Sequence, residues 1–566
     1  MGVLEDQLEQ LELPQTLRER VQVTQDAPQS TGSFVLYLPT VVLRSHHNPA
    51  LAVAARLANH HQVPLVILAV VLDDSLHPVA YPQPLAATSR RLCFVLQALQ
   101  KAVLEWDALG ASVWIRVLGE KARTPHHLTL AGRAIATVTD EPFVEPYRSF
   151  VRSVENVAHT CVRVDGSTTV PPLVKLKRRL NEAGDAVFDG VPNKAWLWQK
   201  ATDAKRKPHV YGAAKYGEMD APQLQNRDGG LQDILPVTWF DEAVSAPNSR
   251  PWTAAELVAV DAVTFSQQYP GWDTSVPPCR QTHGAHGWDR WQSFRNGPLQ
   301  DYARRRNDIL QPHAVSRLSC YLNYGTISIF RIVYELWQLT IDTTKFEDEI
   351  VKWREISYAH AFSTPHYFSP SALPNWSRRW LETQQHSANA SIPLEVLAQA
   401  KSGDKTWDAM QAYLVRTGEL HNNARMTWGK TVVHWHKSEE VSELLKSLSF
   451  LNDRFALDGL SPPSYAGLLW CLGWCDKPAP NGGGISEKPA ARYRRSPDDF
   501  DRAEQLLLTP STSTRTFFPQ SSAKKARVDV SEGVEAKGTT TSPAAPMKTI
   551  LDYFATKGTG PKHVCG

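Results

Sequence analysis

Tryptophan is the residue type whose number and spacing most invite a chemical explanation in this chain. The 566-residue sequence contains 18 tryptophans, and a side chain of this size usually packs or stacks where it occurs. Trp428 and Trp435 are seven residues apart in a segment of helical spacing, which places them on one helix face about 10 Å apart. Such a stripe is most often core packing, but it is also compatible with electron transfer between rings.

Two serines and an arginine form a second group that could act on a charged ligand. Ser316 and Ser319 lie where a helical segment begins, and hydroxyls and backbone N–H groups bind anions well at such a position. The ordinary alternative is that they only cap the helix, and residue type alone leaves both interpretations open. Arg354 stands beside Glu355, a pair that most often forms a solvated face or an internal salt bridge.

The composition narrows the class of protein. Hydrophobic residues make up 42% of the chain and the net charge is +3, which indicates a soluble globular protein whose nucleic-acid site, if any, is a local patch. The seven cysteines are scattered without a CxxC pair, which favours reduced intracellular thiols over disulfides or a zinc site. We expect no membrane span, because no run of about 18 apolar residues occurs, and no signal peptide, because the N-terminus is acidic.

The first 165 residues alternate between short apolar runs and segments of helical spacing. This alternation predicts a doubly wound, parallel α/β domain over residues 33–165, preceded by a polar extension over 1–32 without a clear strand. Such sheets bind ligands at the carboxyl ends of their strands, here near Asp73-Asp74 and Asp140-Glu141. No GxGxxG motif follows the first strand, so a dehydrogenase has little support. The expected strands are 34–38, 63–72, 113–117, 135–138 and 161–164, and the expected helices are 48–60, 87–109 and 125–133.

The remaining residues predict three further segments. Residues 166–255 are rich in Pro, Gly, Asn and Asp and are expected to form an interdomain linker. Residues 256–502 change to long amphipathic stretches, which predicts an all-helical domain. Residues 503–566 are dominated by Ser, Thr, Pro, Ala and Lys and are expected to be a disordered tail. The clearest amphipathic stretches are 313–340, 345–362, 405–435 and 438–448.

Sequence motifs in the helical region resemble those of a known family. SRLSCYLNYG at 316–325 and TGELHNNARM at 417–426, in that order and spacing, resemble the flavin-binding domain of the photolyase/cryptochrome superfamily over about residues 290–476. Within it, RMTWGK at 425–430 and LNDRF at 451–455 are most similar to class II photolyases of cyclobutane pyrimidine dimers, whereas Trp353-Arg354-Glu355 looks more like class I. The resemblance implies a Rossmann-like α/β antenna domain followed by an all-α FAD domain.

The resemblance also implies which residues hold a U-shaped FAD. Arg354 matches an arginine beside the isoalloxazine, where a fixed cation favours the anionic reduced flavin. Asn452 matches the residue facing flavin N5, where an aspartate would instead indicate a plant-type cryptochrome. The implied cofactor-binding residues are Tyr302, Ser316, Arg317, Leu318, Ser319, Arg354, Asn422, Asn452 and Asp458.

On the substrate side the resemblance implies a pocket for a flipped-out lesion. Trp353 and Trp470 match the tryptophans that flank the extruded dimer, because a dimer cannot be reached inside the duplex; a core role for Trp470 is the alternative. Glu349 resembles the acid that hydrogen-bonds the pyrimidine and stabilises the dimer radical anion. Met426 stands where photolyases of the 6-4 photoproduct use a histidine, which disfavours that substrate.

Three further tryptophans match the class II electron relay, namely Trp428, Trp407 and Trp435. The class I relay begins two residues before Trp470, where this chain has Leu468. The chain departs from class II wording at Gly459-Leu-Ser461, which loses a charge pair, and at Cys475-Asp476, where His-Asp is usual.

The tail contains two short motifs. Lys524-Lys-Ala-Arg527 is typical of a nuclear localisation signal. MKTILDYF at 547–554 resembles the motif that docks repair proteins on the replication sliding clamp (PCNA), with Ile550, Tyr553 and Phe554 as the plug residues. The alternative is a chance amphipathic turn.

Together these features predict a monomeric deoxyribodipyrimidine photolyase, a carbon–carbon lyase in which light-excited reduced FAD splits dimers in UV-damaged DNA. A deazaflavin or folate antenna chromophore and a nuclear location are expected, with an organellar or cytoplasmic location left open. The alternatives are a cryptochrome photoreceptor without repair activity and a 6-4 photolyase.

Overall fold

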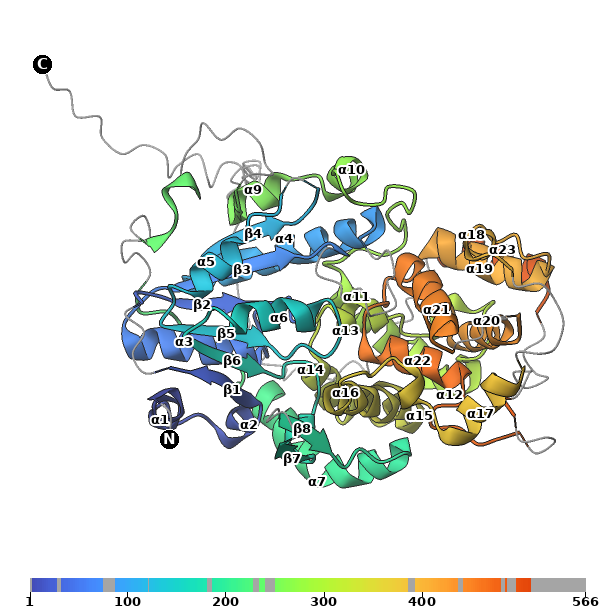
Figure 1. Cartoon of the computed structure of the whole chain (residues 1–566), viewed down its shortest axis with the longest axis horizontal. Helices are drawn as coiled ribbons and strands as arrows, with labels where there is room; N and C mark the ends of the chain where they lie inside the picture. The colour runs from blue at the N-terminus through green and yellow to red at the C-terminus, as the bar shows by residue number, and fades with distance from the viewer. Residues whose placement is uncertain are drawn as a thin grey trace, which may run out of the picture. The chain divides into compact units, whose positions relative to one another are not determined.

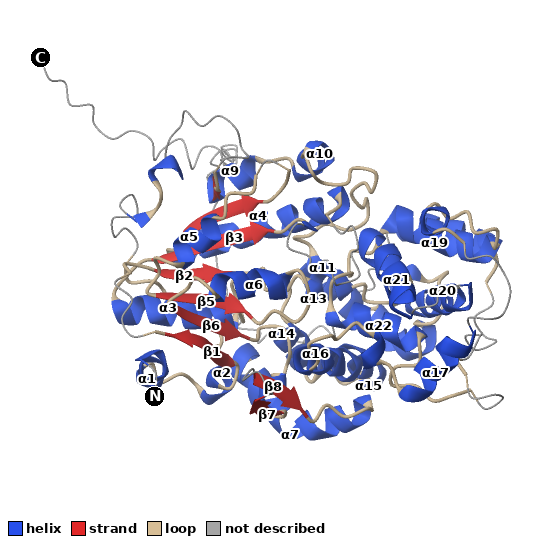
Figure 2. Cartoon of the chain, viewed as in Figure 1, coloured by secondary structure: helices blue, strands red, loops and turns tan. Residues whose placement is uncertain are grey.

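The computed structural model describes residues 3–27, 32–74, 87–120, 122–180, 186–226, 234–239, 250–384, 392–435, 441–479, 484–485 and 495–509. These residues belong to one compact unit. It combines a mainly parallel β-sheet with a large set of helices, as Figures 1 and 2 show. The expected combination of an α/β domain and a helical domain is confirmed.

The sheet has the strand order β1-β6-β5-β2-β3-β4-β9. Its five inner strands pair in parallel, whereas β1 and β9 add antiparallel edges. The inner strands are those expected from the sequence. The strand bounds are β1 Val21–Asp26, β2 Val35–Leu38, β3 Leu65–Val71, β4 Ser112–Val117, β5 Ala136–Asp140, β6 Thr160–Val164 and β9 Trp252–Thr253.

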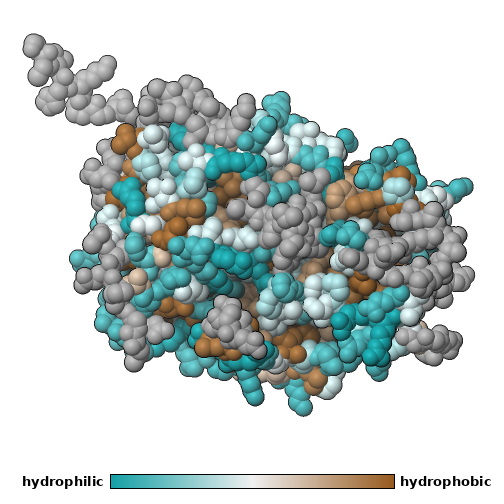
Figure 3. Space-filling view, in the orientation of Figure 1, coloured by the Kyte–Doolittle hydropathy of each residue, from teal (hydrophilic) through white to brown (hydrophobic). Residues whose placement is uncertain are grey.

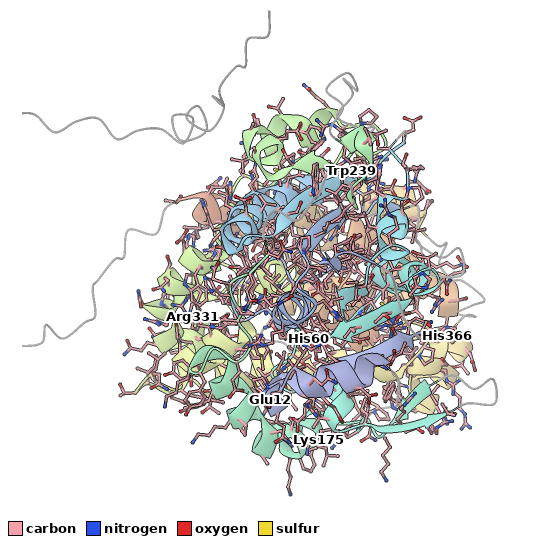
Figure 4. The ribbon with its side chains drawn as sticks, turned by 90° about the vertical axis from the view of Figure 1, so that its left-hand side faces the viewer. Glu12, His60, Lys175, Trp239, Arg331 and His366 are labelled. Carbon is pink, nitrogen blue, oxygen red and sulfur yellow. The ribbon has the colours of Figure 1, made fainter. Side chains whose placement is uncertain are left out.

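Helices cover both faces of the sheet because alternate strand residues point to opposite sides. Tyr37 and Ile67 belong to a core with α3 (Pro49–His61) and α4 (Ser89–Leu109). Leu36 and Leu68 belong to a separate core with α5 (His126–Ala131) and α6 (Tyr147–Glu155). Trp239, labelled in Figure 4, belongs to this second core, and its ring centroid lies 5.1 Å from that of Trp114. Near-continuous apolar strands are therefore buried on both sides, as a doubly wound sheet requires.

The structure differs from expectation at both ends of the α/β domain. The N-terminal extension contains α1 (Val3–Gln10), α2 (Gln15–Arg18) and the strand β1. β1 was missed because its residues alternate weakly, with none fully buried. The expected linker contains the hairpin β7 (Lys177–Leu180) and β8 (Ala186–Asp189) and the 20-residue helix α7 (Ala195–Ala214). α7 has Pro208 inside it, which obscures a helical pattern in the sequence.

The helical domain follows the expected amphipathic stretches but breaks them at glycines. Gly325 and Gly418 both have positive φ, a conformation that only glycine adopts without cost. Each residue ends one helix before the next begins. The helices of this domain are α9 Ala254–Ala259, α10 Ala262–Gln268, α11 Gly287–Arg295, α12 Tyr302–Arg305, α13 Ser319–Asn323, α14 Ile329–Leu336, α15 Thr344–Glu347, α16 Arg354–Ser363, α17 Asn375–Gln384, α18 Leu394–Ala398, α19 Lys405–Thr417, α20 Asn422–Trp435, α21 Val441–Phe455, α22 Pro462–Cys471 and α23 Pro497–Leu508.

Two buried arginines of α4 join the α/β domain to the helical domain. Arg90 donates to the carbonyl oxygen of Phe455 at 2.7 Å. Arg91 donates to the carbonyl oxygens of Asp453 and Ala456 at 2.8 and 3.2 Å, and to the Tyr324 hydroxyl. These bonds satisfy carbonyl groups at the C-terminal end of α21, which would otherwise lack partners. The position of α21 is thus tied to α4.

The carboxyl edge of the sheet is largely filled by the protein itself. The Asp140 carboxylate accepts hydrogen bonds from the backbone N–H groups of Thr40, Val41 and Val42 at 2.7, 3.0 and 3.1 Å and from the Tyr37 hydroxyl at 3.0 Å. The Asp140 carboxylate is therefore engaged by the protein itself and is not open to a ligand. Among the described residues the cavity at this edge measures only about 30 Å³.

No helix in the described ranges is long and apolar enough to cross a membrane. On the face drawn in Figure 3, hydrophobic residues lie scattered among hydrophilic ones. Residues from 510 onward, including the two tail motifs, lie outside the described part of the chain. The last helix, α23, extends to Leu508, past residue 503 where the tail was expected to begin.

Candidate active site

A cavity of about 720 Å³ lies inside the helical domain. A second lobe of about 310 Å³ shares many of its walls. Pockets that enclose small molecules typically measure ~300–1,000 Å³. The cavity is therefore large enough for an organic cofactor.

Most of the site residues expected from the sequence line the main cavity, but five do not. Arg317 lines only the second lobe, and Asn452, Trp407, Trp428 and Trp435 line neither. The expected residues on the main cavity wall are Tyr302, Ser316, Leu318, Ser319, Glu349, Trp353, Arg354, Asn422, Met426, Asp458 and Trp470. Wall residues that were not expected include Arg306, Lys345, Tyr358, Arg425, Lys430 and Trp474.

A π-helical turn positions Glu349 and Trp353. Residues Asp348–Trp353 form this turn between α15 and α16. A π-helix closes its hydrogen bonds over five residues rather than four and often marks a functional site. Glu349 and Trp353, four residues apart in this turn, both line the cavity.

The Glu349 carboxylate is already paired. Its Oε1 lies 2.6 Å from Arg306 Nη2 and 2.8 Å from Lys345 Nζ. The side chain is 26% exposed, so the group remains within reach of a ligand. Arg306 and Lys345 hold the carboxylate against the wall, which fixes the direction of its free lone pairs.

Arg354 presents a positive charge that no carboxylate neutralises within the described residues. Its Nη1 donates to the Ser167 carbonyl oxygen at 2.7 Å, and its Nη2 donates to the Tyr358 hydroxyl at 3.1 Å. Its guanidinium carbon lies 4.4 Å from the centroid of the Tyr358 ring. The side chain is thus held rigidly by neutral groups, and its charge is available to an anion in the cavity.

The loop before α13 carries hydroxyl groups toward the cavity. Arg317 has a positive φ of 54° and forms a two-pronged ion pair with Glu419, which holds the loop in place. Ser316 and Ser319, on either side, line the cavity. No hydrogen-bond partner is recorded for either hydroxyl in the described part of the chain. These open donors, with Arg354, fit a cofactor that carries phosphate and anionic ring groups.

Asn452 is buried just behind the cavity wall. Its Nδ2 donates to Asp453 Oδ1 at 2.7 Å and to Ser464 Oγ at 2.9 Å, and its side chain is 1% exposed. Asp453 also accepts from the Tyr465 hydroxyl at 2.8 Å. Burial raises the pKa of Asp453, and the hydrogen bonds from Tyr465 and Asn452 and the charge of Arg91 oppose that rise.

Replacing Asn452 by aspartate is expected to destabilise the protein more at high pH than at low pH. The new carboxylate would lie beside the buried Asp453, so its pKa in the folded protein would rise above the unfolded value of about 4. Stability is then lost as the pH rises from that value through the folded pKa. We expect a loss of about 3–5 kcal/mol in the free energy of unfolding near pH 8, and a smaller loss near pH 5, measured by urea denaturation. Asn452→Ala is the control: it removes the hydrogen bond to Asp453 without adding a charge, so its loss should depend on pH less steeply than that of Asn452→Asp.

Trp353 and Trp470 contact each other in this structure. Their ring centroids are 4.4 Å apart and their planes are inclined by 36°. A base inserted between two rings needs about 7 Å, twice the ~3.5 Å contact distance. The two rings therefore form one continuous apolar wall, and a flipped base would stack on that wall unless the rings separate.

The three tryptophans expected to form an electron relay, Trp428, Trp407 and Trp435, lie next to one another in a chain of rings. Trp428 and Trp407 lie nearly parallel, with centroids 6.2 Å apart and planes inclined by 8°, and Trp407 lies 5.4 Å from Trp435. Trp428 is 0% exposed and Trp407 1% exposed, whereas Trp435 is only partly buried. The three rings thus lead from the interior toward the surface, in the order expected from the sequence.

The structure shows the surroundings of the two segments, 459–461 and 475–476, at which the sequence departs from the class II motifs. Asp458 forms a two-pronged ion pair with Arg425 at 2.9 and 3.1 Å, so its charge has a partner. Ser461 caps α22, because its Oγ accepts from the Ser464 N–H at 3.3 Å. Burial raises the pKa of the Cys475 thiol to about 12, so it is a neutral, unreactive group at ordinary pH.

A scan against protein-family models matches none. Among relatives, a deoxyribodipyrimidine photo-lyase of Methanothermobacter thermautotrophicus is 25% identical over 457 residues, covering 80% of this chain and 89% of its own length. One of Arabidopsis thaliana is 25% identical over 457 residues, covering 77% of this chain and 81% of its own length. One of Oryza sativa subsp. japonica is 32% identical over 356 residues, covering 59% of this chain and 68% of its own length.

Solved structures agree on the fold. A class III photolyase of Agrobacterium tumefaciens has a TM-score of 0.50 and 17% identity, covering 79% of this chain and 81% of its own. A cryptochrome of Synechocystis has a TM-score of 0.54 and 13% identity, covering 84% of this chain and 87% of its own. At these identities the structures support the fold alone. The relatives in sequence carry the family assignment: the chain belongs to the deoxyribodipyrimidine photo-lyase family, within the photolyase/cryptochrome superfamily.

Proposed function

We propose that this protein is a light-driven lyase that splits cyclobutane pyrimidine dimers in UV-damaged DNA. The observation that carries the proposal is one cavity that brings together a rigid cation, Arg354, and an apolar wall of two tryptophans. The three relatives named above are all deoxyribodipyrimidine photo-lyases, which supports the same activity.

FAD is the cofactor that the cavity fits. When bound and reduced, FAD would supply the light-excited electron that opens the cyclobutane ring. Ser316 and Ser319 would donate to the diphosphate, and Arg354 would favour the anionic form of the ring. Asn452 lies behind the cavity wall and donates a hydrogen bond to the Ser464 hydroxyl, and Ser464 lines the cavity.

The lesion would be held by groups that exclude water and fix its orientation. Trp353 and Trp470 offer flat faces to the extruded pyrimidines. Glu349, oriented by Arg306 and Lys345, would accept a hydrogen bond from a pyrimidine N–H. Met426 lines the same cavity and has no acidic proton, so it cannot serve as the proton donor that 6-4 repair would require there.

For a light-harvesting chromophore, a deazaflavin or a folate, we propose a second cavity. This cavity of about 220 Å³ lies between the two domains and is lined by Arg44, His47, Lys101, Trp288 and Arg331, among others. Arg331, labelled in Figure 4, stacks over the Trp288 ring at 4.3 Å. The cationic side chains that line this second cavity suit a planar anion. The cavity at the carboxyl edge of the sheet, by contrast, is nearly filled among the described residues.

Membership of class II, a nuclear location and sliding-clamp binding are further parts of the proposal. The Trp428–Trp407–Trp435 chain of rings supports class II. On the sequence alone, a nuclear location is supported by the basic cluster at 524–527. Sliding-clamp binding is supported by Ile550, Tyr553 and Phe554. Fusion of residues 510–566 to a fluorescent protein would test the location.

The test of the main proposal is repair of a defined lesion. Purified protein, reconstituted with FAD and chemically reduced, should restore thymines in an oligonucleotide with one cyclobutane dimer under near-ultraviolet or blue light, and not in the dark. Repair of a 6-4 photoproduct instead would assign the other photolyase activity. A flavin-bound protein that repairs neither lesion would be a cryptochrome-type photoreceptor.

A further inference from the structure

Five basic side chains line the main cavity, and four of them have evident partners. Arg306 and Lys345 pair with Glu349, Arg425 pairs with Asp458, and Arg354 is held by Ser167 and Tyr358. Lys430 is the fifth, and within the described ranges the structure records no ion pair or hydrogen bond for its ammonium group. The ammonium of this partly buried lysine is therefore available to an anionic ligand in the cavity.

Lys430 lies on the face of α20 that lines the cavity, and Trp428 lies on another face of the same helix. Asn422, Met426 and Lys430 follow one another at four-residue intervals, and all three line the cavity. This spacing is that of neighbours on one helix face. Trp428 points away from the cavity, toward α19, where its Nε1 donates to Gln411.

Lys430 lies at the end of the cavity that holds the tryptophan wall. Burial raises the pKa of the Cys471 thiol and the nearby charge of Lys430 opposes that rise; Cys471 directly follows Trp470. The neighbouring Gly429 packs against Cys471 so closely that an added Cβ would lie 2.6 Å from its Sγ. Lys430 is absent from the walls of the second lobe, which Ser316, Arg317 and Ser319 line. The ammonium is therefore on the side of Trp470 and away from the expected phosphate cradle.

We propose that Lys430 contacts a negatively polarised oxygen of the flipped dinucleotide. This proposal rests on the proposed function. The oxygen belongs either to the phosphate between the two damaged nucleotides or to a pyrimidine carbonyl, which gains charge when the dimer receives its electron. In both cases the contact exists only when the lesion is extruded into the cavity.

Lys430→Gln is the test, with Lys430→Arg to restore the charge and Lys446→Gln as the control. Lys446 is a solvent-facing lysine of α21 whose ammonium pairs with Glu443. Three quantities are measured for each variant: flavin content by absorbance, affinity for DNA with and without one dimer over a range of salt concentrations, and dimers repaired per absorbed photon. The first two quantities do not depend on repair activity.

Loss of a phosphate contact would weaken binding of dimer-containing DNA, lower the slope of log affinity against log salt by roughly one unit, and leave undamaged DNA unaffected. Loss of a carbonyl contact would lower the repair yield per photon by several-fold, because a fixed donor aimed at developing charge would no longer stabilise the reduced dimer. Either result, reversed by Lys430→Arg, supports the proposal.

Three results would overturn it. Lys430→Gln could match Lys446→Gln in lesion affinity and in repair, it could lose flavin, or it could weaken damaged and undamaged DNA equally. If the unaltered protein repairs no dimers, the proposed function fails on that observation alone, and the comparison of lesion affinities still decides the role of Lys430.

Discussion

Replacing Trp428 by phenylalanine is expected to slow light-driven reduction of the bound flavin by more than about tenfold, a barrier change above ~1.4 kcal/mol. Trp428 is the fully buried end of the chain of rings, stacked on Trp407 at 6.2 Å with planes inclined by only 8°. Phenylalanine keeps a ring at this place but is far harder to oxidise, so it cannot pass an electron inward. Flash photolysis of the oxidised protein with an external electron donor measures the rate.

The repair reaction itself should survive this substitution. Chemically reduced Trp428→Phe protein should repair dimers at the normal yield, because the relay only restores the reduced cofactor. The substitution also removes the hydrogen bond from Trp428 Nε1 to Gln411 Oε1, so some loss of stability is expected, about 1–3 kcal/mol. Trp106→Phe, in the equally buried Trp106 of α4, controls for that loss. A normal photoreduction rate in Trp428→Phe would show that electrons reach the flavin by another route.

How far the sequence predicts the fold depends on how strongly each element is buried. The inner strands are buried along almost their whole length, and each contains a short apolar run that predicts it. β1 lies at the sheet edge with no fully buried residue, and edge strands carry little hydrophobic signal. α7 contains Pro208 and shows no strong apolar face, so propensity pointed to a linker where tertiary packing forms a helix.

The sequence predicts the place of a site residue well where the residue type alone determines its role. It predicts that place less well where the side chain is held by hydrogen bonds to neighbouring residues. Arg354 and Ser319 line the cavity as expected, because each lies beside a helix start that faces inward. Asn452 lies behind the wall, because its two amide hydrogens are used by Asp453 and Ser464. No sequence pattern shows that pairing.

The contact between Trp353 and Trp470 was not predictable either. Both residues were identified, but their distance depends on how the π-helical turn and α22 approach one another. In the sequence Lys430 is only the last residue of the string RMTWGK, and its significance appears when the partners of the other cavity cations are known. Charge compensation is a property of the folded cavity.

Replacing Trp470 by alanine is expected to weaken binding of dimer-containing DNA by roughly 10- to 100-fold, since stacking of one base on an aromatic ring is worth about 1–3 kcal/mol. Trp470 supplies half of the apolar wall, and its removal would leave the extruded pyrimidines facing water. Affinity for undamaged DNA should not change, because phosphate contacts outside the cavity provide it. Fluorescence anisotropy on matched oligonucleotides, with and without one dimer, measures the ratio of the two affinities.

Flavin content separates this prediction from a packing role for Trp470. If the ring only packs, its loss should release flavin and lower stability, with both DNA affinities falling together. If it stacks on the lesion, flavin stays bound, Trp470→Phe recovers part of the affinity, and Trp196→Ala, which removes a tryptophan that is 57% exposed on α7, has no effect. The double variant with Trp353→Ala should lose less than the sum of the two single losses, because the two rings touch and substitutions at contacting residues are not additive. Strict additivity would mean that the rings act separately, on opposite sides of the lesion, and that they part when DNA binds.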